Sequence, residues 1–295
     1  FAQPDPETVK AALAKIPFVV SFSSFMDETA RNADLILPNH VYLERYEDVP
    51  NPVGFNRPFV GLVQPVVEPR YETRSVGDVL IELAQALGDP VAGAFPWESY
   101  ETCLEETYPD QWDALTEDGY WMAEDFTPAP WPQAFETASA KFEFLPEGLQ
   151  SGYAPVELAG ETGAFPLVLV PYDTMRISSG YIGNPPFMTK TVSGEVLSGK
   201  DLLVEINPKT AEQLGLSEGG RAVLATPNGT ADVRVHLFEG IMPGLVAMAR
   251  GLGHTAYDKY LAGKGTNVNR LIGPVADPVS GLDAAWGVRA KLSRA

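Results

Sequence analysis

Three hydroxyl side chains near the start of the chain lie where an α/β sheet would hold an anion. Ser23, Ser24 and Thr29 follow residues 18–22, an apolar run with the pattern of a buried strand. In open α/β sheets, anionic ligands bind beyond the end of a strand, beside the helix that follows it. Hydroxyls at such positions are also ordinary helix caps. Both interpretations stay open, and on these residues alone the sequence favours capping.

Glycine and asparagine are concentrated in two segments near the end of the chain. Residues 251–254 are Gly-Leu-Gly-His, and residues 263–269 are Gly-Lys-Gly-Thr-Asn-Val-Asn. Glycine lets the backbone approach another group closely, and the amides of Asn267 and Asn269 supply both donors and acceptors. The pattern suits the edge of a heteroaromatic ligand, and it also suits tight loops closed by Asx turns.

Metal binding and nucleophilic catalysis by the chain's own cysteine and histidine residues are not expected. Cys103 is the one cysteine, which excludes an intrachain disulfide and a cysteine-based zinc or iron–sulfur site. Carboxylates two or three positions away on both sides oppose formation of its thiolate. The three histidines are far apart in the sequence: His40, His236 and His254. We therefore expect no catalytic residue and no metal ligand in this chain.

The composition limits the classes of partner. The chain has 295 residues, of which 45% are hydrophobic, so one or two domains with a substantial core are possible. Lys and Arg number 21 and Asp and Glu 39, which gives a net charge of −18. Such acidity argues against nucleic acid and anionic lipid as partners. No window approaches the roughly 18 apolar residues that a membrane span needs, so we expect no direct membrane span.

The first third of the sequence has the pattern of half an α/β sheet. A helix is expected from Glu7 to Ile16, and strands are expected at residues 18–22 and 35–38. A short helix between the two strands gives the strand, helix, strand order of an open parallel sheet. Ser75 is expected to cap a second helix over residues 76–87, with apolar residues on one face. That face consists of Val76, Val79, Leu80, Leu83 and Leu87.

Residues 96–132 are acidic, aromatic and poorly periodic. The tryptophans of this stretch are Trp97, Trp112, Trp121 and Trp131. The stretch could cover a site or form a docking surface for another subunit. The interpretation that the pattern favours is a solvated connection anchored by its tryptophans. A short strand is expected after it, at residues 138–144.

The last part of the chain has the pattern of a compact β-barrel, with short strands and one short helix closed by tight turns. Strands are expected at residues 165–170, 202–206, 222–225, 233–237 and 245–248. Asn207 and Pro208 are expected to begin the helix, and Gly215 to end it in a left-handed conformation. Asn228-Gly229 is a hairpin signal between two strands.

Five motifs, in order, resemble the downstream half of the molybdopterin bis-guanine-dinucleotide oxidoreductases, the dimethyl-sulfoxide-reductase superfamily. They are residues 29–38 with Glu44, 137–144, 206–215, 240–244 and 265–269. The resemblance implies an α/β half-domain, a partial doubly wound parallel sheet, over residues 1–95 and a double-psi β-barrel domain over residues 161–295. Residues 96–160 are the acidic, Trp-rich connection between them.

The resemblance also implies a site for molybdopterin guanine dinucleotide. The positions that match family nucleotide contacts are Ser23, Ser24, Thr29, Asp34, Tyr172, Asp173, Arg176, Asn267 and Asn269. Arg176 suits either a bidentate phosphate contact or a salt bridge. Gly219-Gly220 replaces the usual Gly-Asp, and the loop after the first barrel strand lacks the His-rich form of catalytic members. These departures favour a chain that has lost the cofactor.

Within the superfamily, residues 23–29 and 43–48 look most like subunits of membrane-attached quinone oxidoreductases, namely the menaquinone reductase complex and alternative complex III. That resemblance implies a scaffold without an active molybdenum site on the periplasmic side of the cytoplasmic membrane. Its partners would be the upstream half of the same subunit and iron–sulfur, cytochrome c and integral membrane quinone-binding subunits. The alternatives are the cofactor-clamping half of a catalytic molybdenum or tungsten polysulfide or thiosulfate reductase, and a stand-alone, non-redox barrel binding domain.

Overall fold

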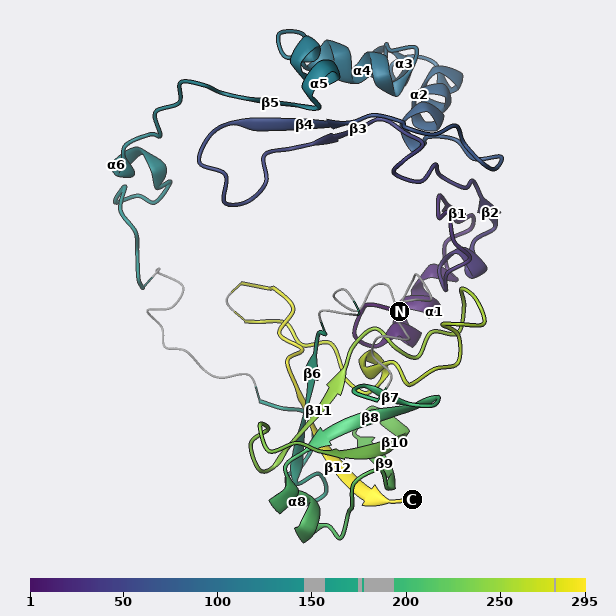
Figure 1. Ribbon diagram of the computed structural model, residues 1–295, viewed down its shortest axis with the longest axis vertical. Helices are drawn as coiled ribbons and strands as arrows, with labels where there is room; N and C mark the ends of the chain where they lie inside the picture. Colours follow the sequence, from purple (N-terminus) through teal and green to yellow (C-terminus); the bar gives the residue numbers. More distant parts are fainter. Residues whose placement is uncertain (146–156, 175–176, 178–193, 279) are drawn as a thin grey trace. The chain divides into compact units, whose positions relative to one another are not determined.

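The chain folds into two compact units (Figure 1). The computed structural model describes residues 1–145, 157–174, 177, 194–278 and 280–295. The first unit, called here the barrel unit, consists of residues 1–19, 26–32 and 147–295. The second, the sheet–helix unit, consists of residues 20–25 and 33–146. The domain boundaries at residues 95 and 160 follow sequence motifs and stay a prediction. Among the described residues, no helix has the length and hydropathy needed to cross a membrane.

A closed six-stranded barrel forms the centre of the barrel unit, as predicted. Its strands are β6 (Leu167–Tyr172), β8 (Asp201–Ile206), β9 (Arg221–Thr226), β10 (Gly229–Leu237), β11 (Leu245–Ala249) and β12 (Val288–Arg294). They pair in the order β10-β9-β12-β6-β11-β8, and a parallel pairing of β8 with β10 closes the ring. The β6–β11 pair is also parallel, and β7 (Leu197–Ser198) adds to the outer edge of β8.

Alternation along the strands explains the barrel core. Leu202, Val204 and Ile206 of β8 and Val246 and Met248 of β11 are completely buried. Each large aliphatic side chain removed from water contributes about 1.5 to 3 kcal/mol. These side chains point to the interior because successive residues of a strand face opposite sides.

The short helix and the hairpin of the barrel follow local signals in the sequence. Asn207 caps α8 (Pro208–Gln213) by accepting a hydrogen bond from the Lys209 N–H, and Gly215 ends it with φ at 66°. The β9–β10 hairpin is confirmed, but its turn residues are Pro227 and Asn228 rather than Asn228-Gly229. The Asn228 side chain donates to the Leu271 carbonyl, which holds the turn one residue earlier.

Helix α1 (Pro6–Leu13) also belongs to the barrel unit, together with the short helices η1 (Ala30–Asn32) and η4 (Val268–Arg270). Asp5 caps α1 by accepting a hydrogen bond from the Thr8 N–H. The helix ends three residues before the predicted Ile16. After Leu13 the Lys15 and Ile16 N–H groups bond carbonyls three positions back, those of Ala12 and Leu13, and Pro17 has no N–H to continue the helix.

The sheet–helix unit contains a two-stranded parallel pair and a three-stranded antiparallel sheet. The strands are β1 (Val20–Ser21), β2 (Leu35–Ile36), β3 (Glu47–Val49), β4 (Phe59–Val63) and β5 (Tyr120–Met122). The helices are α2 (Val76–Leu87), α3 (Val91–Ala94), α4 (Tyr100–Thr107), α5 (Trp112–Asp118) and α6 (Trp131–Ala134). The β1–β2 pair is the parallel strand pair expected from the sequence, shortened to two residues on each strand.

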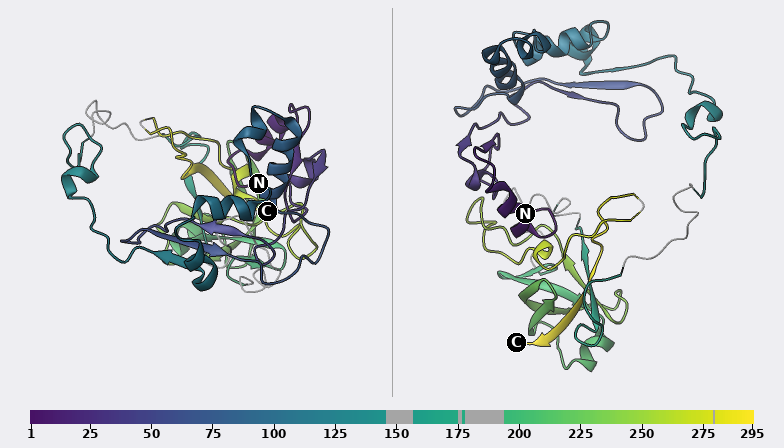
Figure 2. Two further views of the ribbon diagram at one scale, coloured as in Figure 1. Left: turned by 90° about the horizontal axis from the view of Figure 1, so that it is seen from above. Right: turned by 180° about the vertical axis from the view of Figure 1, so that it is seen from behind.

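The acidic stretch is folded, which corrects the prediction of a solvated connection. Its helices α4 and α5 lie against one face of the β3-β4-β5 sheet (Figure 2), and β5 is an edge strand of that sheet. Leu104 and Leu115 are buried with Val60 and Leu62 of β4. The strand expected at residues 138–144 is absent, because the Thr137 hydroxyl bonds the backbone N–H and carbonyl of the same residue, Lys141, and closes a turn.

Helix α2 has the predicted bounds but buries a different face. Ile81 and Ala84 are buried, whereas Leu80, Leu83 and Leu87 are exposed. Gly77 lies one helical turn before Ile81, and an added Cβ there would lie 2.5 Å from the Tyr100 ring. The missing side chain lets the first residue of α4 pack onto the stripe of α2 that continues through Ile81 and Ala84, a contact that hydrophobic periodicity does not reveal.

Candidate functional site

A cavity of about 570 Å³ lies within the barrel unit and is called here the barrel-unit cavity. This volume is within the usual range for small-molecule sites. Helix α1 and Phe1 form one wall, and residues 28–32 form a second. The barrel loops around residues 253–255 and 267–270 complete it.

Glu28 holds the second wall to the barrel loop. Its carboxylate accepts hydrogen bonds from His254 Nδ1 at 3.0 Å, from the Thr255 N–H at 2.8 Å and from the Ala256 N–H at 3.2 Å. Arg31 adds a bond from its guanidinium to the Thr255 carbonyl at 2.8 Å. The Glu28 carboxylate is therefore the centre of a cluster that joins residues 28–32 to the barrel.

His254 is buried beside this carboxylate, with 1% of its surface exposed. The Phe1 ring stacks on the imidazole with a centroid distance of 3.6 Å, and the Tyr257 ring meets it edge-on at 5.1 Å. We assign the proton to Nδ1, because an ionised carboxylate only accepts hydrogen bonds. The Nε2 atom is buried and has no hydrogen-bond partner within the described residues.

The two predicted asparagines contact the start of the chain. The side-chain amides of Asn267 and Asn269 both donate to the Phe1 carbonyl, at 2.9 and 3.1 Å. Asn267 Oδ1 also accepts from the Asn269 N–H, which forms the Asx turn that the sequence left open. Gly253 packs directly on this segment, because a Cβ there would lie 2.0 Å from the Asn267 backbone nitrogen.

The barrel-unit cavity carries more positive charge than the rest of this acidic chain. Lys10, Arg31 and Arg270 line it together with Glu7 and Glu28, so its formal charge is 3 − 2 = +1. Arg270 forms an ion pair with Glu7. Among the described residues, the Lys10 ammonium has no ion-pair or hydrogen-bond partner. An anionic group in the cavity would meet at least one unneutralised cation.

Hydrogen bonding controls the ionisation of Glu28. Burial by itself would raise its pKa, but the bonds from His254 and the Thr255 N–H outweigh burial and lower the pKa to about 2 from 4.5. Because the folded-state pKa is lower, the carboxylate stabilises the fold fully above pH 4.5, and this contribution is lost as the pH falls towards 2.

We therefore expect the barrel unit to lose stability more steeply between pH 4.5 and 2 in the wild-type chain than in Glu28→Gln. The measurement is urea unfolding at a series of pH values, followed by circular dichroism. Parallel pH dependences in the two proteins would contradict the role given to this carboxylate.

The structure brings some of the predicted site residues together and separates others. Thr29 and Asn267 line the barrel-unit cavity, and Asn269 is buried beside it. Tyr172 donates to Glu205 at the end of β6, and burial with this carboxylate raises the pKa of Tyr172. Asp173 is exposed.

The remaining predicted residues lie elsewhere. Ser23, Ser24 and Asp34 belong to the sheet–helix unit, and the two serines donate to backbone carbonyls of Phe25 and Asn39. Arg176 lies outside the described residues. The cavity residues that the sequence did not indicate are Lys10, Glu28, Arg31 and Arg270. His254 was noted in a glycine-rich loop, but nothing in the sequence pointed to its pairing with Glu28.

The barrel unit has features that fit a nucleotide-bearing pterin. Besides the cationic cavity, the side-chain nitrogens Arg250 Nε and His254 Nε2 are buried, and neither has a hydrogen-bond partner within the described residues. Buried side-chain nitrogens without protein partners are able to bind polar atoms of a ligand. Lys10, Arg31, Arg270 and Thr29 would hold the phosphates. When bound, such a group supplies the metal at which electron or atom transfer occurs.

No group of His, Cys, Asp or Glu able to hold a metal ion is present in the described part of the chain. Cys103 lies in the sheet–helix unit, where burial raises the pKa of its thiol and the carboxylates of Glu106 and Asp48 raise it further, against a lowering by Thr107. This direction agrees with the expected inertness of Cys103 as a nucleophile.

Two family models match the chain. The model for molybdopterin oxidoreductase matches residues 1–86, and the model for the molydopterin dinucleotide binding domain matches residues 182–288. Neither covers residues 87–181.

Known proteins match over nearly the whole chain. A menaquinone reductase, molybdopterin-binding-like subunit, from Nitratidesulfovibrio vulgaris is 35% identical over 295 residues, which is 100% of this chain and 40% of that protein. The arsenate respiratory reductase molybdopterin-containing subunit ArrA from Shewanella sp. is 24% identical over 100% of this chain and 43% of that protein.

Acetylene hydratase from Pelobacter acetylenicus has the same fold, with a TM-score of 0.75 and 21% identity over 99% of this chain and 42% of that chain. The chain thus spans less than half the length of these relatives. The two matched models, the full-length similarity and the barrel agree on one assignment. The chain belongs to the molybdopterin oxidoreductase family.

Proposed function

We propose that this chain is part of the molybdopterin-family subunit of a membrane-associated respiratory quinone oxidoreductase complex. Its role there is structural, beside iron–sulfur, cytochrome c and integral membrane quinone-binding subunits on the periplasmic side, and it supports no molybdenum chemistry. The observation that carries the proposal is the 35% identity to the menaquinone reductase subunit along all 295 residues.

The internal bonding of the barrel-unit cavity supports a role without the cofactor. The amides of Asn267 and Asn269, which the resemblance assigns to the nucleotide, bind the Phe1 carbonyl instead. Arg270 is neutralised by Glu7, and Glu28 places a permanent negative charge in the wall. Because Asn267, Asn269 and Arg270 already have partners within the chain, they keep their positions without a ligand.

A second candidate function is the cofactor-clamping part of a catalytic molybdenum or tungsten reductase that acts on a sulfur compound. The observation that favours it is the pair of buried, unpartnered atoms, Arg250 Nε and His254 Nε2, within the described residues. Buried polar atoms usually have partners, so these two unpartnered nitrogens favour a polar ligand in the barrel unit.

The deciding experiment uses the complete natural complex. Molybdenum and tungsten are measured per subunit by mass spectrometry, pterin by the fluorescence of its oxidised derivatives, and GMP by chromatography after acid release. The structural role predicts metal and pterin far below one per subunit. Stoichiometric metal together with pterin would contradict the structural role and support the second candidate function. GMP without metal would show that a nucleotide site is retained in a subunit without molybdenum chemistry.

A further inference from the structure

The folded acidic stretch is not accounted for by the proposed function. Residues 96–132 contribute nothing to the barrel-unit cavity and lie outside the ranges that the family models match. They nevertheless form α4, α5 and β5 and share a core with β4. A stretch of this composition that is ordered and packed presents a fixed surface, not a variable linker.

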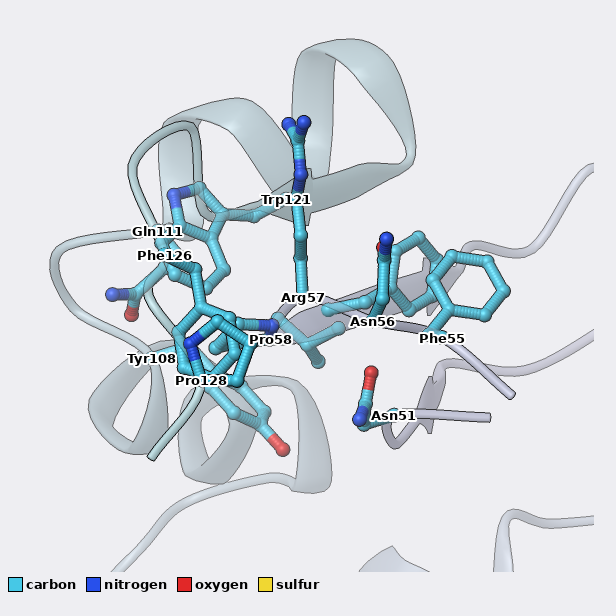
Figure 3. A pocket seen from close by; sticks show the side chains of 12 residues that line it. Asn51, Phe55, Asn56, Arg57, Pro58, Tyr108, Gln111, Trp121, Phe126 and Pro128 are labelled. Atoms are coloured by element: carbon cyan, nitrogen blue, oxygen red, sulfur yellow. The ribbon is translucent and has the colours of Figure 1, made fainter. Parts of the chain in front are cut away.

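This surface contains a cavity of about 640 Å³, called here the aromatic cavity, built entirely from the sheet–helix unit. Two chain segments line it, residues 51–60 before and within β4 and residues 108–128 around α5 and β5. Tyr108, Trp121 and Phe126 form one side, and Phe55 lies on the other (Figure 3). Phe55 packs against Phe59 with a centroid distance of 4.8 Å.

The polar side chains of the aromatic cavity suit a peptide backbone. Asn51, Asn56 and Gln111 line it, and within the described residues their side-chain amides have no hydrogen-bond partner. Each amide offers both donors and an acceptor, which are the groups that the backbone of an extended peptide can pair with. Aromatic-lined grooves with such groups recognise extended, proline-containing segments.

The charge around the aromatic cavity selects a cationic partner. Arg57 is the one charged residue that lines the cavity, but the chain around it is acidic, because residues 108–128 contain six Asp and Glu and no Lys or Arg. The excess of negative charge extends beyond this segment, because residues 75–140 contain fourteen Asp and Glu and no Lys, Arg or His. Arg57 is exposed, and its N–H groups are suited to peptide carbonyls. The surrounding field therefore attracts a basic chain and repels an acidic one.

We propose that the aromatic cavity is a docking site for an extended, basic, proline-containing segment of a partner protein. Proline rings of the partner pack between Phe55 and Phe126, its backbone pairs with Asn51 and Gln111, and its lysines or arginines face the carboxylates of residues 108–128. The proposal does not depend on whether the barrel-unit cavity holds a cofactor.

The test measures binding of fluorescein-labelled synthetic peptides to the full chain by fluorescence anisotropy. The probe contains three Lys-Pro-Pro repeats, and its controls contain three Glu-Pro-Pro or three Lys-Gly-Ser repeats. We expect the Lys-Pro-Pro probe to bind with a Kd of about 10 to 100 μM, more weakly at high salt. Both control peptides should bind at least about tenfold more weakly.

Two variants and one matched control locate the site on the chain. Phe126→Ala, a change at an exposed side chain outside the buried cluster, should weaken binding of the probe about tenfold. The double change of Glu124 and Asp125 to Gln should reduce both affinity and its dependence on salt. Phe144→Ala, at an exposed phenylalanine that does not line the aromatic cavity, should leave binding unchanged.

Three results would overturn the proposal. Equal binding of the Lys-Gly-Ser control would reveal charge attraction without a docking site. Equal loss in Phe126→Ala and Phe144→Ala would place the contact elsewhere. Absence of binding by the Lys-Pro-Pro probe at millimolar concentration, with circular dichroism showing a folded chain, would exclude this class of partner.

Discussion

Replacing Gly253 by alanine is expected to lower the free energy of unfolding of the barrel unit by about 4 kcal/mol or more, at the upper end of the range for single substitutions. The added Cβ would lie 2.0 Å from the backbone nitrogen of Asn267 and 2.4 Å from the carbonyl carbon of Thr266. Both are backbone atoms, so no side chain can move aside to make room. Gly253 also has φ at 86°, which disfavours any other residue.

Gly263→Ala is the matched control for this prediction. Gly263 is in the neighbouring loop with φ at 74°, but a Cβ there would meet no atom within 4 Å. The Gly263→Ala change should lower the free energy of unfolding only by the strain of the left-handed conformation, about 1 to 2 kcal/mol. Urea unfolding, followed by near-ultraviolet circular dichroism, measures the free energy of unfolding of both variants. Similar losses in the two variants would mean that the approach of the two backbones at Gly253 is not the dominant effect.

Glu28→Ala is expected to destabilise the barrel unit by about 3 kcal/mol. The change leaves the Nδ1–H of buried His254 and the N–H groups of Thr255 and Ala256 without their common acceptor. An unfilled donor on the buried His254 ring costs more than the net gain of the bond itself. Chemical unfolding of the wild-type and variant chains gives this difference directly.

Two controls separate the hydrogen bonds of Glu28 from its charge. Glu28→Gln keeps an acceptor oxygen for the backbone N–H groups and should lose about half as much stability as Glu28→Ala. Glu82→Ala removes an exposed carboxylate that pairs with Arg74 on the surface of α2, and no measurable change is expected. A loss in Glu82→Ala equal to that in Glu28→Ala would show that charge alone, and not buried hydrogen bonding, accounts for the effect.

Local chemistry explains which elements could be predicted. Asn207, Pro208 and Gly215 determine both ends of α8 through bonds and conformations that involve only their near neighbours. The apolar run before Asn207 becomes β8, and α2 begins after Ser75 and ends before Gly88 as predicted. The Ser75 side chain makes no capping bond, however, and Asn39 Oδ1 accepts from the Val76 N–H instead. The order of motifs also identified the family and its barrel.

The candidate site was predictable only in part. The family resemblance pointed to Thr29 and Asn267, which both line the barrel-unit cavity. Glu28 and His254 are separated by 226 positions, and no spacing rule relates residues so far apart. Lys10 and Arg270 likewise become neighbours of one cavity only when α1 packs beside η4.

The sequence by itself determined the local elements, the barrel pattern and the family, because caps, turns and alternation depend on residues a few positions apart. Only the tertiary structure decided that α2 buries Ile81 and Ala84, and that the acidic stretch folds onto β4. It also decided that Glu28 pairs with His254. These outcomes depend on close contacts between distant segments, whose free energies come from packing and burial that a linear pattern does not contain.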